Sequence, residues 1–489
     1  MVVCISLGAG LLFAAAGCAG ERPATRSARI ASATLAPCHR LGDQAECGYL
    51  VVPEDPHLHR GRSIRLHVVV LRALEPRTGA APLFHLEGGP GVAASTAAIA
   101  FYLGPGRRYR RYRDVVLVDQ RGTGRSHPLR CPEIERRSAL DDQYRVEDVA
   151  ACRARLVQRA DLGHYGTANA ADDLDRVRAA LGYERIDLWA LSYGTQLAQV
   201  YLRSFPGRVR RAVLAGVAPL DFPTPLPHAV NAQRVLDRLF EQCGADPACD
   251  AAYPTLHASW ETVLARVSAG AIPGLRRGPF GEAVRRLLET TTQQRRLPYL
   301  IDRAARGDVS PLLQSLRALR DPTAEGLYLS VACAEGTLRI AEEDVRSFTA
   351  GTFVGDHRVR NQLSACRRWP VRPVPRTFFA PPGSGAAVLI LSGEMDATTP
   401  PAYARRVCAA LRCHLVSFPL LAHGPFDLDA WKHGDCFDRI AVAFYEAEDP
   451  SVLDTSCVAA MQPPPFAVGV RGQSASLSPL DRAEEIVAP

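Results

Sequence analysis

Three residues of this chain have the types that nucleophilic catalysis needs, and each follows an apolar stretch of strand length. Ser192 comes directly after the apolar run in "LWALSYGT", Asp396 follows "VLILSGEM", and His423 follows "HLVSFPLLA". A serine hydroxyl is a poor nucleophile at neutral pH, so it needs a base within hydrogen-bond distance and a carboxylate to orient that base. If the three strand ends meet, these residues form a Ser–His–Asp triad for acyl transfer.

Such a triad also needs fixed N–H donors, because attack on a carbonyl carbon produces a negatively charged oxygen. The backbone N–H of Tyr193, the residue after the serine, can supply one donor. The turn in "EGGPG" can supply another through Gly88 or Gly89, since glycine lets the backbone approach a ligand closely. These parts suffice for hydrolysis, so we expect no metal and no organic cofactor.

Apolar segments of strand length alternate with helical patterns around these residues, which predicts the sheet that must position them. We expect strands within 63–73, 81–91, 113–126, 186–192, 210–219, 386–401 and 414–426, and a helix over 170–183. This alternation is typical of the α/β class, with a mostly parallel sheet covered by helices on both faces. The order serine, aspartate, histidine along the chain is that of an α/β-hydrolase.

The strand–helix alternation stops near residue 222 and resumes near 376, which indicates an insertion. We expect 37–222 and 376–465 to form two parts of one core, and 223–375 to form a helical lid. Amphipathic patterns over 231–243 and 280–291 predict helices within this insertion.

The two ends of the chain differ from this core. Residues 1–18 are apolar and end in small residues, as in a cleaved signal peptide, and Cys18 stands where a bacterial lipoprotein would be lipidated. Residues 19–36 have the composition of a polar tether, and 466–489 that of a flexible tail. We therefore expect an exported protein that is periplasmic, anchored as a lipoprotein or secreted.

Cysteine usage supports export. Apart from Cys4 and Cys18, the number of cysteines is even and they lie in neighbouring pairs along the chain. This arrangement predicts local disulfides in an oxidising compartment. They are Cys38, Cys47, Cys131, Cys152, Cys243, Cys249, Cys333, Cys366, Cys408, Cys413, Cys436 and Cys457. A metal site is the weaker interpretation, because no CxxC or His-rich spacing occurs.

The net charge of +7 on 489 residues comes almost wholly from arginine, since Lys432 is the sole lysine. These arginines are scattered, with no long basic block and no aromatic-interleaved RNA motif, so nucleic-acid binding is not favoured. We expect the partner to be a peptide or small acyl substrate, with membrane contact only through an N-terminal lipid anchor.

Taken together, "LEGGPG", "VDQRGTGRS", "LSYGT", "SGEMDATTP" and "AHG" resemble the secreted α/β-hydrolases of the prolyl and tripeptidyl aminopeptidase branch. The resemblance covers about 37–465 and implies that Ser192, Asp396 and His423 are the triad and that the insertion covers the site. It also implies an exo-acting aminopeptidase that cleaves peptides from a free N-terminus. Ala190 stands where this branch usually has glycine.

An aminopeptidase must hold the substrate's ammonium, and a buried or lid-borne carboxylate does this best. We hypothesise that Glu335, beside an expected Cys333–Cys366 bridge, anchors this amine, with Glu87 as a second candidate. Two alternatives remain open: a carboxylesterase or lipase with the same triad, and a non-catalytic envelope lipoprotein that uses the fold to bind. The sequence selects neither a substrate length nor an oligomeric state.

Overall fold

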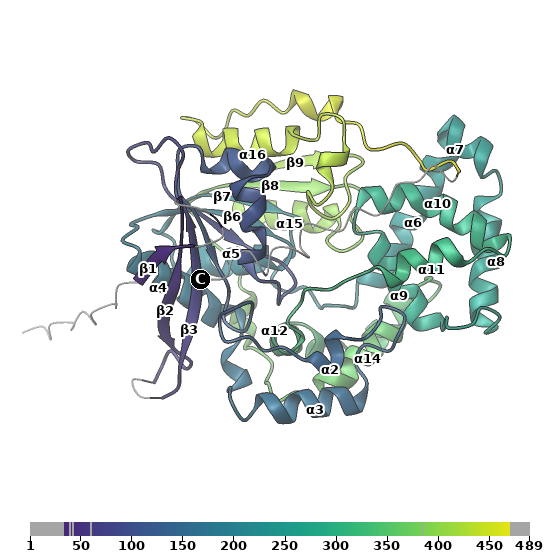
Figure 1. The fold of residues 1–489 in the computed structure, drawn as a ribbon, viewed down its shortest axis with the longest axis horizontal. Helices are drawn as coiled ribbons and strands as arrows, with labels where there is room; N and C mark the ends of the chain where they lie inside the picture. The colour runs from purple at the N-terminus through teal and green to yellow at the C-terminus, as the bar shows by residue number, and fades with distance from the viewer. Residues whose placement is uncertain (1–33, 39–40, 42–43, 59–60, 384, 470–489) are drawn as a thin grey trace, which may run out of the picture.

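The computed structural model describes residues 34–38, 41, 44–58, 61–383 and 385–469, and within them the chain forms one sheet of nine strands (Figure 1). The strand order is β1-β2-β3-β5-β4-β6-β7-β8-β9. The strands are β1 (Thr34–Pro37), β2 (Ala45–Pro53), β3 (Ser63–Leu71), β4 (Leu83–Leu86), β5 (Val115–Val118), β6 (Ile186–Leu191), β7 (Val209–Ala215), β8 (Ala387–Gly393) and β9 (His414–Phe418).

The first three strands run antiparallel to their neighbours, and all pairs from β5 and β4 to β9 are parallel. Every residue of β4, β5 and β6 is buried, as expected for parallel strands covered on both faces. Because parallel strands end at the same edge, the residues that follow β4, β6, β8 and β9 are brought together there.

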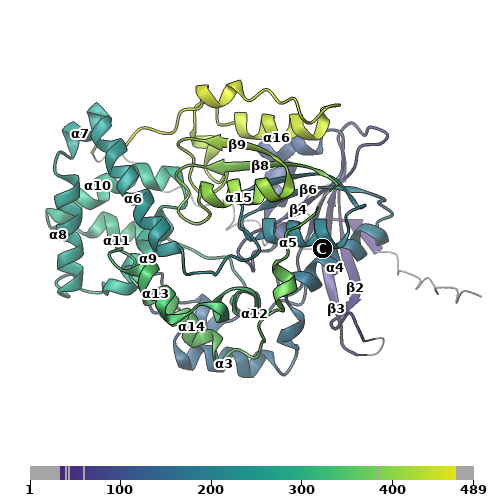
Figure 2. The ribbon, with the colours of Figure 1, turned by 180° about the vertical axis from the view of Figure 1, so that it is seen from behind.

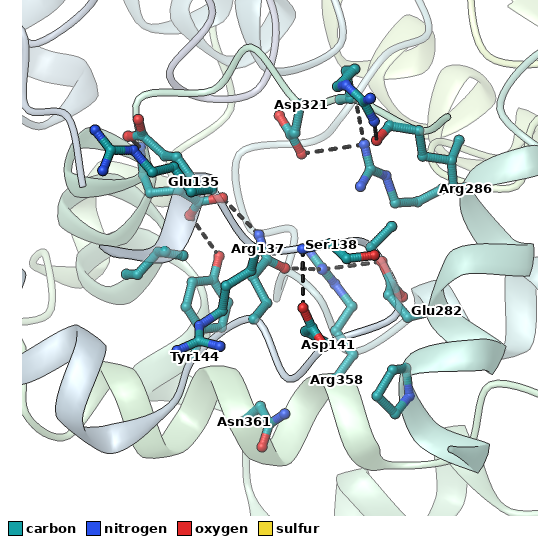
Figure 3. Close-up of a pocket in the computed structure, with 18 of the residues that line it drawn as sticks. Glu135, Arg137, Ser138, Asp141, Tyr144, Glu282, Arg286, Asp321, Arg358 and Asn361 are labelled. Atoms are coloured by element: carbon teal, nitrogen blue, oxygen red, sulfur yellow. Dashed lines mark hydrogen bonds and ion pairs between the residues drawn. The ribbon is translucent and has the colours of Figure 1, made fainter. Parts of the chain in front are cut away.

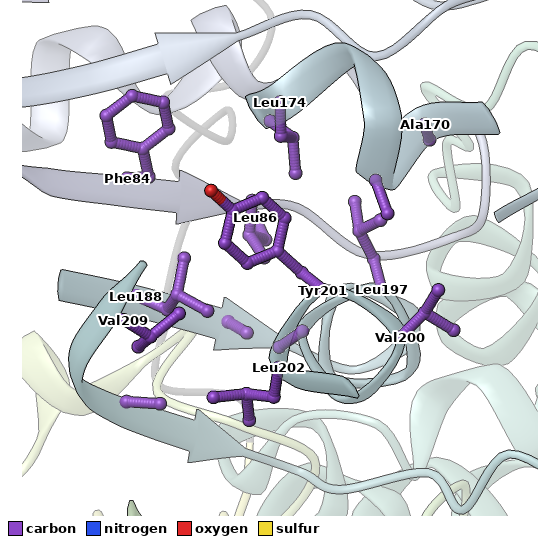
Figure 4. Packing of buried hydrophobic residues seen from close by; sticks show 14 of the residues in the cluster. Phe84, Leu86, Ala170, Leu174, Leu188, Leu197, Val200, Tyr201, Leu202 and Val209 are labelled. Atoms are coloured by element: carbon purple, nitrogen blue, oxygen red, sulfur yellow. The ribbon is translucent and has the colours of Figure 1, made fainter. Parts of the chain in front are cut away.

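Helices cover both faces of the sheet (Figure 2). α4 (Thr167–Ala180), α5 (Tyr193–Ser204) and α15 (Pro401–Leu411) pack on one face, and α1 (Ala98–Tyr102) and α16 (Cys436–Glu446) pack on the other. Figure 4 shows the first of these interfaces. Its labelled side chains include Phe84, Leu86, Leu188 and Val209 from the sheet and Leu174, Leu197, Val200 and Tyr201 from the helices.

A helical lid lies between β7 and β8, in the interval where the sequence predicts an insertion. Its helices are α6 (His228–Ala245), α7 (Pro247–Ala252), α8 (Leu256–Ser268), α9 (Arg277–Leu287), α10 (Thr291–Ala305), α11 (Ser310–Arg317), α12 (Glu325–Glu335), α13 (Glu342–Thr349) and α14 (His357–Cys366). α6 and α8 to α11 surround an apolar core of their own. α12 and α14 instead pack against α3 (Val146–Leu156), close to α2 (Pro132–Glu135) (Figure 1).

All twelve cysteines of the described chain are joined to the neighbours that the sequence pairs them with. The disulfides are Cys38–Cys47, Cys131–Cys152, Cys243–Cys249, Cys333–Cys366, Cys408–Cys413 and Cys436–Cys457. The bridge between Cys333 and Cys366 fastens α12 to α14. Disulfides at this density are typical of proteins that leave the cytoplasm.

Three sequence-based boundaries are wrong. Residues 34–36, predicted to be part of the tether, belong instead to the edge strand Thr34–Pro37, which pairs with β2. Phe466, predicted to begin the tail, is buried against the lid, and the guanidinium of Arg295 lies 4.2 Å from its ring. The single helix predicted over 280–291 is divided, since α9 ends at Leu287 and α10 begins at Thr291.

The signal peptide predicted over 1–18, its lipidated Cys18, and the remaining parts of the tether and tail lie outside the described residues. Within the described ranges, no helix combines the length and the apolar character that crossing a membrane requires.

Candidate active site

Ser192 stands at a sharp turn between β6 and α5. Its backbone has φ 54° and ψ −122°, a conformation that a residue with a side chain adopts only where its surroundings hold it. Gly194, two residues on, makes the turn possible, because a Cβ there would lie 2.2 Å from the Leu86 carbonyl oxygen. Ala190, which replaces the usual glycine, is fully buried within the apolar layer between sheet and helices. The strand–turn–helix element predicted around Ser192 therefore holds its side chain out at the sheet edge.

His423 lies between Ser192 and Asp396. Its Nε2 is 3.0 Å from the serine Oγ, and its Nδ1 is 2.8 Å from Asp396 Oδ2. Asp396 is fully buried and His423 is 5% exposed. The structure thus brings together the three residues that the sequence singles out, with the hydrogen-bond order of a Ser–His–Asp triad.

Asp396 is held by the turn that follows it. Its Oδ1 accepts the backbone N–H groups of Thr398 and Thr399, each at 2.7 Å, and its Oδ2 accepts the Thr399 hydroxyl at 2.7 Å. The Thr399 Oγ1 also lies 3.0 Å from His423 Nδ1. Thr399 is not among the residues that the sequence singles out, although an aspartate with threonines two and three residues later is typical of a turn of this kind.

The electrostatics of the triad favour a charged imidazole. Burial by itself lowers the pKa of His423, but the adjacent Asp396 carboxylate outweighs burial and raises the pKa above its ordinary value. An imidazole in this setting accepts a proton from the serine more readily than an imidazole in water.

The turn after β4 lies beside the serine. A Cβ on Gly88 would lie 3.1 Å from Cβ of Ser192. The Gly88 N–H donates to Glu87 Oε1 at 3.2 Å, whereas no acceptor within the described chain takes the N–H of Gly89. Of the two candidate glycines, Gly89 therefore has the free donor. The second N–H donor for the oxyanion comes from Tyr193. Because Tyr193 is the first residue of α5, its N–H has no acceptor within that helix.

The two carboxylates considered as amine anchors both have partners. Glu87 Oε2 lies 2.6 Å from Nε2 of His85, and this contact holds the pKa of Glu87 below its usual value although burial opposes it. Glu335 accepts the N–H of Thr167 at 2.7 Å through Oε1 and its hydroxyl at 2.6 Å through Oε2. An incoming ammonium would have to displace or share these contacts.

A cavity of about 520 Å³ lies in the lid, between α9, α14 and the segment around α2 (Figure 3). Its wall includes Glu282, Glu325 and Arg358. Arg358 pairs with Glu282 at 3.1 Å. Glu325 has no Arg or Lys at ion-pair distance within the described residues; its carboxyl accepts from the Gln143 amide at 2.7 Å and from Tyr144 Oη at 2.9 Å.

Burial raises the pKa of Glu325 to about 8. A buried carboxyl of this kind is stabilised by any cation that reaches it. This cavity has no signal in the sequence, because its lining residues come from four separate segments.

One arginine connects the cavity wall to the triad. Arg285 contacts Glu282 at 2.8 Å and Glu289 at 2.8 Å, and its Nη1 lies 3.5 Å from the Thr398 hydroxyl. Thr398 is one of the residues whose N–H holds Asp396. A chain of contacts through Arg285 therefore links the cavity wall to the turn that holds Asp396.

His228, at the start of α6, is close to both regions, since charged residues of each act on its ring. Its ring is buried, and neither ring nitrogen has a hydrogen-bond partner within the described chain. Burial lowers the pKa of this imidazole well below its ordinary value, and the positive charges of Arg285, Arg358 and His423 lower the pKa further. A neutral ring with two unpaired nitrogens is suited to contact a polar substrate.

In the part of the chain that the structure describes, no three His, Cys, Asp or Glu side chains are grouped so as to hold a metal ion.

Comparisons with known proteins agree with this geometry. Residues 82–251 match the family described as alpha/beta hydrolase fold, and residues 351–457 match the family described as TAP-like protein. The chain is a hydrolase with the alpha/beta hydrolase fold. Its C-terminal part matches the TAP-like family, the group that the sequence motifs resemble.

Its relatives include peptidases. The chain is 25% identical to "Serine protease Hip1" of Mycobacterium tuberculosis over 83% of this chain and 87% of that protein. It is 33% identical to "Tripeptidyl aminopeptidase" of Streptomyces coelicolor over 35% of each chain. Among solved structures, the proline iminopeptidase of Mycobacterium smegmatis aligns with 88% of this chain and 99% of that chain, at 16% identity and a TM-score of 0.43.

Proposed function

We propose that the protein is an exported serine aminopeptidase that releases residues from the free N-terminus of peptides through an acyl-enzyme. The contact between His423 Nε2 and Ser192 Oγ at 3.0 Å is the observation that carries the hydrolytic part. The peptidase part is supported by the similarity to Hip1 and to tripeptidyl aminopeptidase. Export places the protein in the periplasm, on a membrane through Cys18, or outside the cell.

The reaction proceeds in two halves. Ser192 attacks the scissile carbonyl carbon while His423 takes the hydroxyl proton, and the developing oxyanion accepts the N–H groups of Tyr193 and Gly89. His423 then gives its proton to the leaving amine. Water, activated by the same imidazole, releases the acyl group from the serine. Asp396 keeps Nδ1 as the protonated nitrogen and stabilises the imidazolium.

The lid cavity is the best place for the free amine of the substrate. Glu325 is a buried carboxyl with no Arg or Lys at ion-pair distance within the described residues, and it lines this cavity. The Glu282 carboxylate in the same wall is linked to the triad through Arg285. An ammonium bound there would ionise Glu325 and form a charge-assisted hydrogen bond. Glu335 and Glu87 are less suitable because neither of them lines this cavity, and Glu87 already lies 2.6 Å from His85 Nε2.

The test is a substrate panel on the purified full chain: peptidyl p-nitroanilides with a free amine, the same compounds N-acetylated, and p-nitrophenyl butyrate. We expect cleavage of the free-amine anilides and little cleavage of the acetylated ones. Hydrolysis of the ester without any anilide would make the protein an esterase. No turnover, together with no reaction of Ser192 with a phosphonate, would favour a binding protein.

The amine site is tested by Glu325→Gln, with Glu343→Gln on the exposed surface of α13 as the control. Glu325→Gln should raise KM for free-amine anilides about tenfold, the effect of about 1.4 kcal/mol, and leave the ester unaffected. Equal KM values in Glu325→Gln and Glu343→Gln would place the amine elsewhere.

A further inference from the structure

A chain of hydrogen bonds joins the lid helix α12 to the residue that follows the nucleophile. Glu335, the last residue of α12, holds the Thr167 hydroxyl at 2.6 Å through Oε2. The Thr167 Oγ1 in turn lies 2.8 Å from the phenolic oxygen of Tyr193. The exposed fractions of these residues are 6% for Glu335, 0% for Thr167 and 3% for Tyr193. Water therefore does not compete for these contacts.

The direction of this chain follows from its donors. When Glu335 is ionised, the Thr167 hydroxyl donates its one proton to this carboxylate and accepts the proton of the Tyr193 phenol. The Thr167 N–H donates to the other Glu335 oxygen at 2.7 Å. Thr167 is the first residue of α4, where a carboxylate also interacts favourably with the helix dipole. All donors thus converge on one carboxylate.

Tyr193 is the residue through which such a chain can affect catalysis. Its backbone N–H is a proposed oxyanion donor, and its peptide adjoins Ser192, whose φ is 54°. A strained turn keeps its geometry only if side chains around it hold it in place. The buried Tyr193 ring packs in the apolar cluster that also contains α12 residues such as Leu327 and Tyr328. The phenol fixes this ring at its far end.

We propose that Glu335 and Thr167 are positioning residues, which act through the Tyr193 phenol to hold the oxyanion donor and the nucleophile turn in their reactive geometry. The proposal rests on the proposed serine mechanism. It gives Glu335 a role on the core side of the lid, in place of contact with substrate. The lid then contributes to the chemical step as well as to substrate binding.

The test uses four variants of the full chain: Tyr193→Phe, Glu335→Gln, Thr167→Val and Thr167→Ser. We expect the first three to lower kcat about tenfold, a fraction of the loss when an oxyanion donor is removed outright, with KM within about twofold. The loss should be equal on a free-amine anilide and on p-nitrophenyl butyrate. Thr167→Ser keeps the hydroxyl and should retain wild-type kcat.

Two further measurements separate positioning from a general loss of structure. A boronic acid forms a tetrahedral adduct with the serine, so its inhibition constant should rise by the same factor as kcat falls. The double variant Tyr193→Phe/Thr167→Val should lose no more than either single variant, since both break one chain. Tyr193→Phe removes a single oxygen and is the variant to rely on if Thr167→Val melts early.

Unchanged kcat in Tyr193→Phe and Glu335→Gln would overturn the proposal. So would an effect of Glu335→Gln on KM for free-amine substrates alone, which would make Glu335 the amine anchor. Reaction of wild-type Ser192 with a fluorophosphonate distinguishes failure of the positioning role from failure of the proposed serine mechanism. If wild-type Ser192 reacts and the variants are unimpaired, only the positioning role fails. If it does not react, the serine mechanism fails and the positioning role fails with it.

Discussion

The imidazole of His423 lies 3.0 Å from the hydroxyl oxygen of Ser192, although 231 positions separate the two residues in the chain. The contact exists because β6 and β9 end at the same edge of a parallel sheet. The whole lid is inserted in the chain between the strands that precede these two residues. The site therefore forms only when β8 and β9 pair with the first part of the sheet.

The pH dependence of the reaction follows from the pKa of His423. The imidazole acts as a base only when neutral, and its pKa in the folded protein is raised above 6.5. We therefore expect kcat/KM to rise with pH and to reach half its plateau above pH 6.5. Initial rates on one anilide from about pH 5 to about pH 9 measure this profile. A midpoint below the ordinary histidine value would contradict the described environment.

The pH dependence of stability should report Glu325. Its pKa is about 8 in the folded protein against 4.5 for a free carboxyl, so between these values the folded state binds one proton more than the unfolded state. Stability contributed by this proton is therefore lost as pH rises, by up to about 1.4 kcal/mol per pH unit.

Glu325→Gln removes the pH-dependent stability contributed by Glu325. It retains the contribution of Glu335, whose pKa burial raises to about 7. Urea unfolding of both proteins at about pH 5.5 and about pH 7.5 should show a smaller decrease in the variant. Parallel decreases would mean that Glu325 is not buried as described.

Arg285 should be important for stability. Arg285→Met removes the ion pair with Glu289 and one of the two ion pairs of Glu282, which keeps its pair with Arg358. The Arg285 side chain is 4% exposed, so both lost pairs involve a buried cation. Breaking a buried pair in this way costs about 3 kcal/mol, measured as the free energy of unfolding in urea. Arg303→Met, which removes an exposed pair with Asp308, is the matched control and should change little. Equal effects of the two substitutions would contradict the role of Arg285.

The sequence predicts those features that depend on local pattern. The apolar run before Ser192 and the helical pattern after it define a strand and a helix wherever the rest of the chain lies, and the same holds for the strands before Asp396 and His423. The edge strand Thr34–Pro37 is not recognisable, because it is short and lies next to a polar segment. The break between α9 and α10 falls within one continuous amphipathic pattern.

Contacts between distant segments have no such signal. Nothing next to Thr167 in the sequence indicates that it takes the carboxylate of Glu335, and nothing next to Glu325 indicates a cavity. Both depend on how α12 packs between α3, α14 and the core. For the same reason the sequence draws attention to Glu335, which lies next to the Cys333–Cys366 bridge, but only the fold reveals that its partner is Thr167.

The central claim is that Ser192 is a nucleophile activated by His423, and its most direct test is mass spectrometry of the chain after reaction with a fluorophosphonate. We predict one adduct, on the peptide that contains Ser192, absent in Ser192→Ala and formed far more slowly in His423→Ala. An unmodified Ser192, or an adduct that forms at the same rate without the imidazole, would contradict the account.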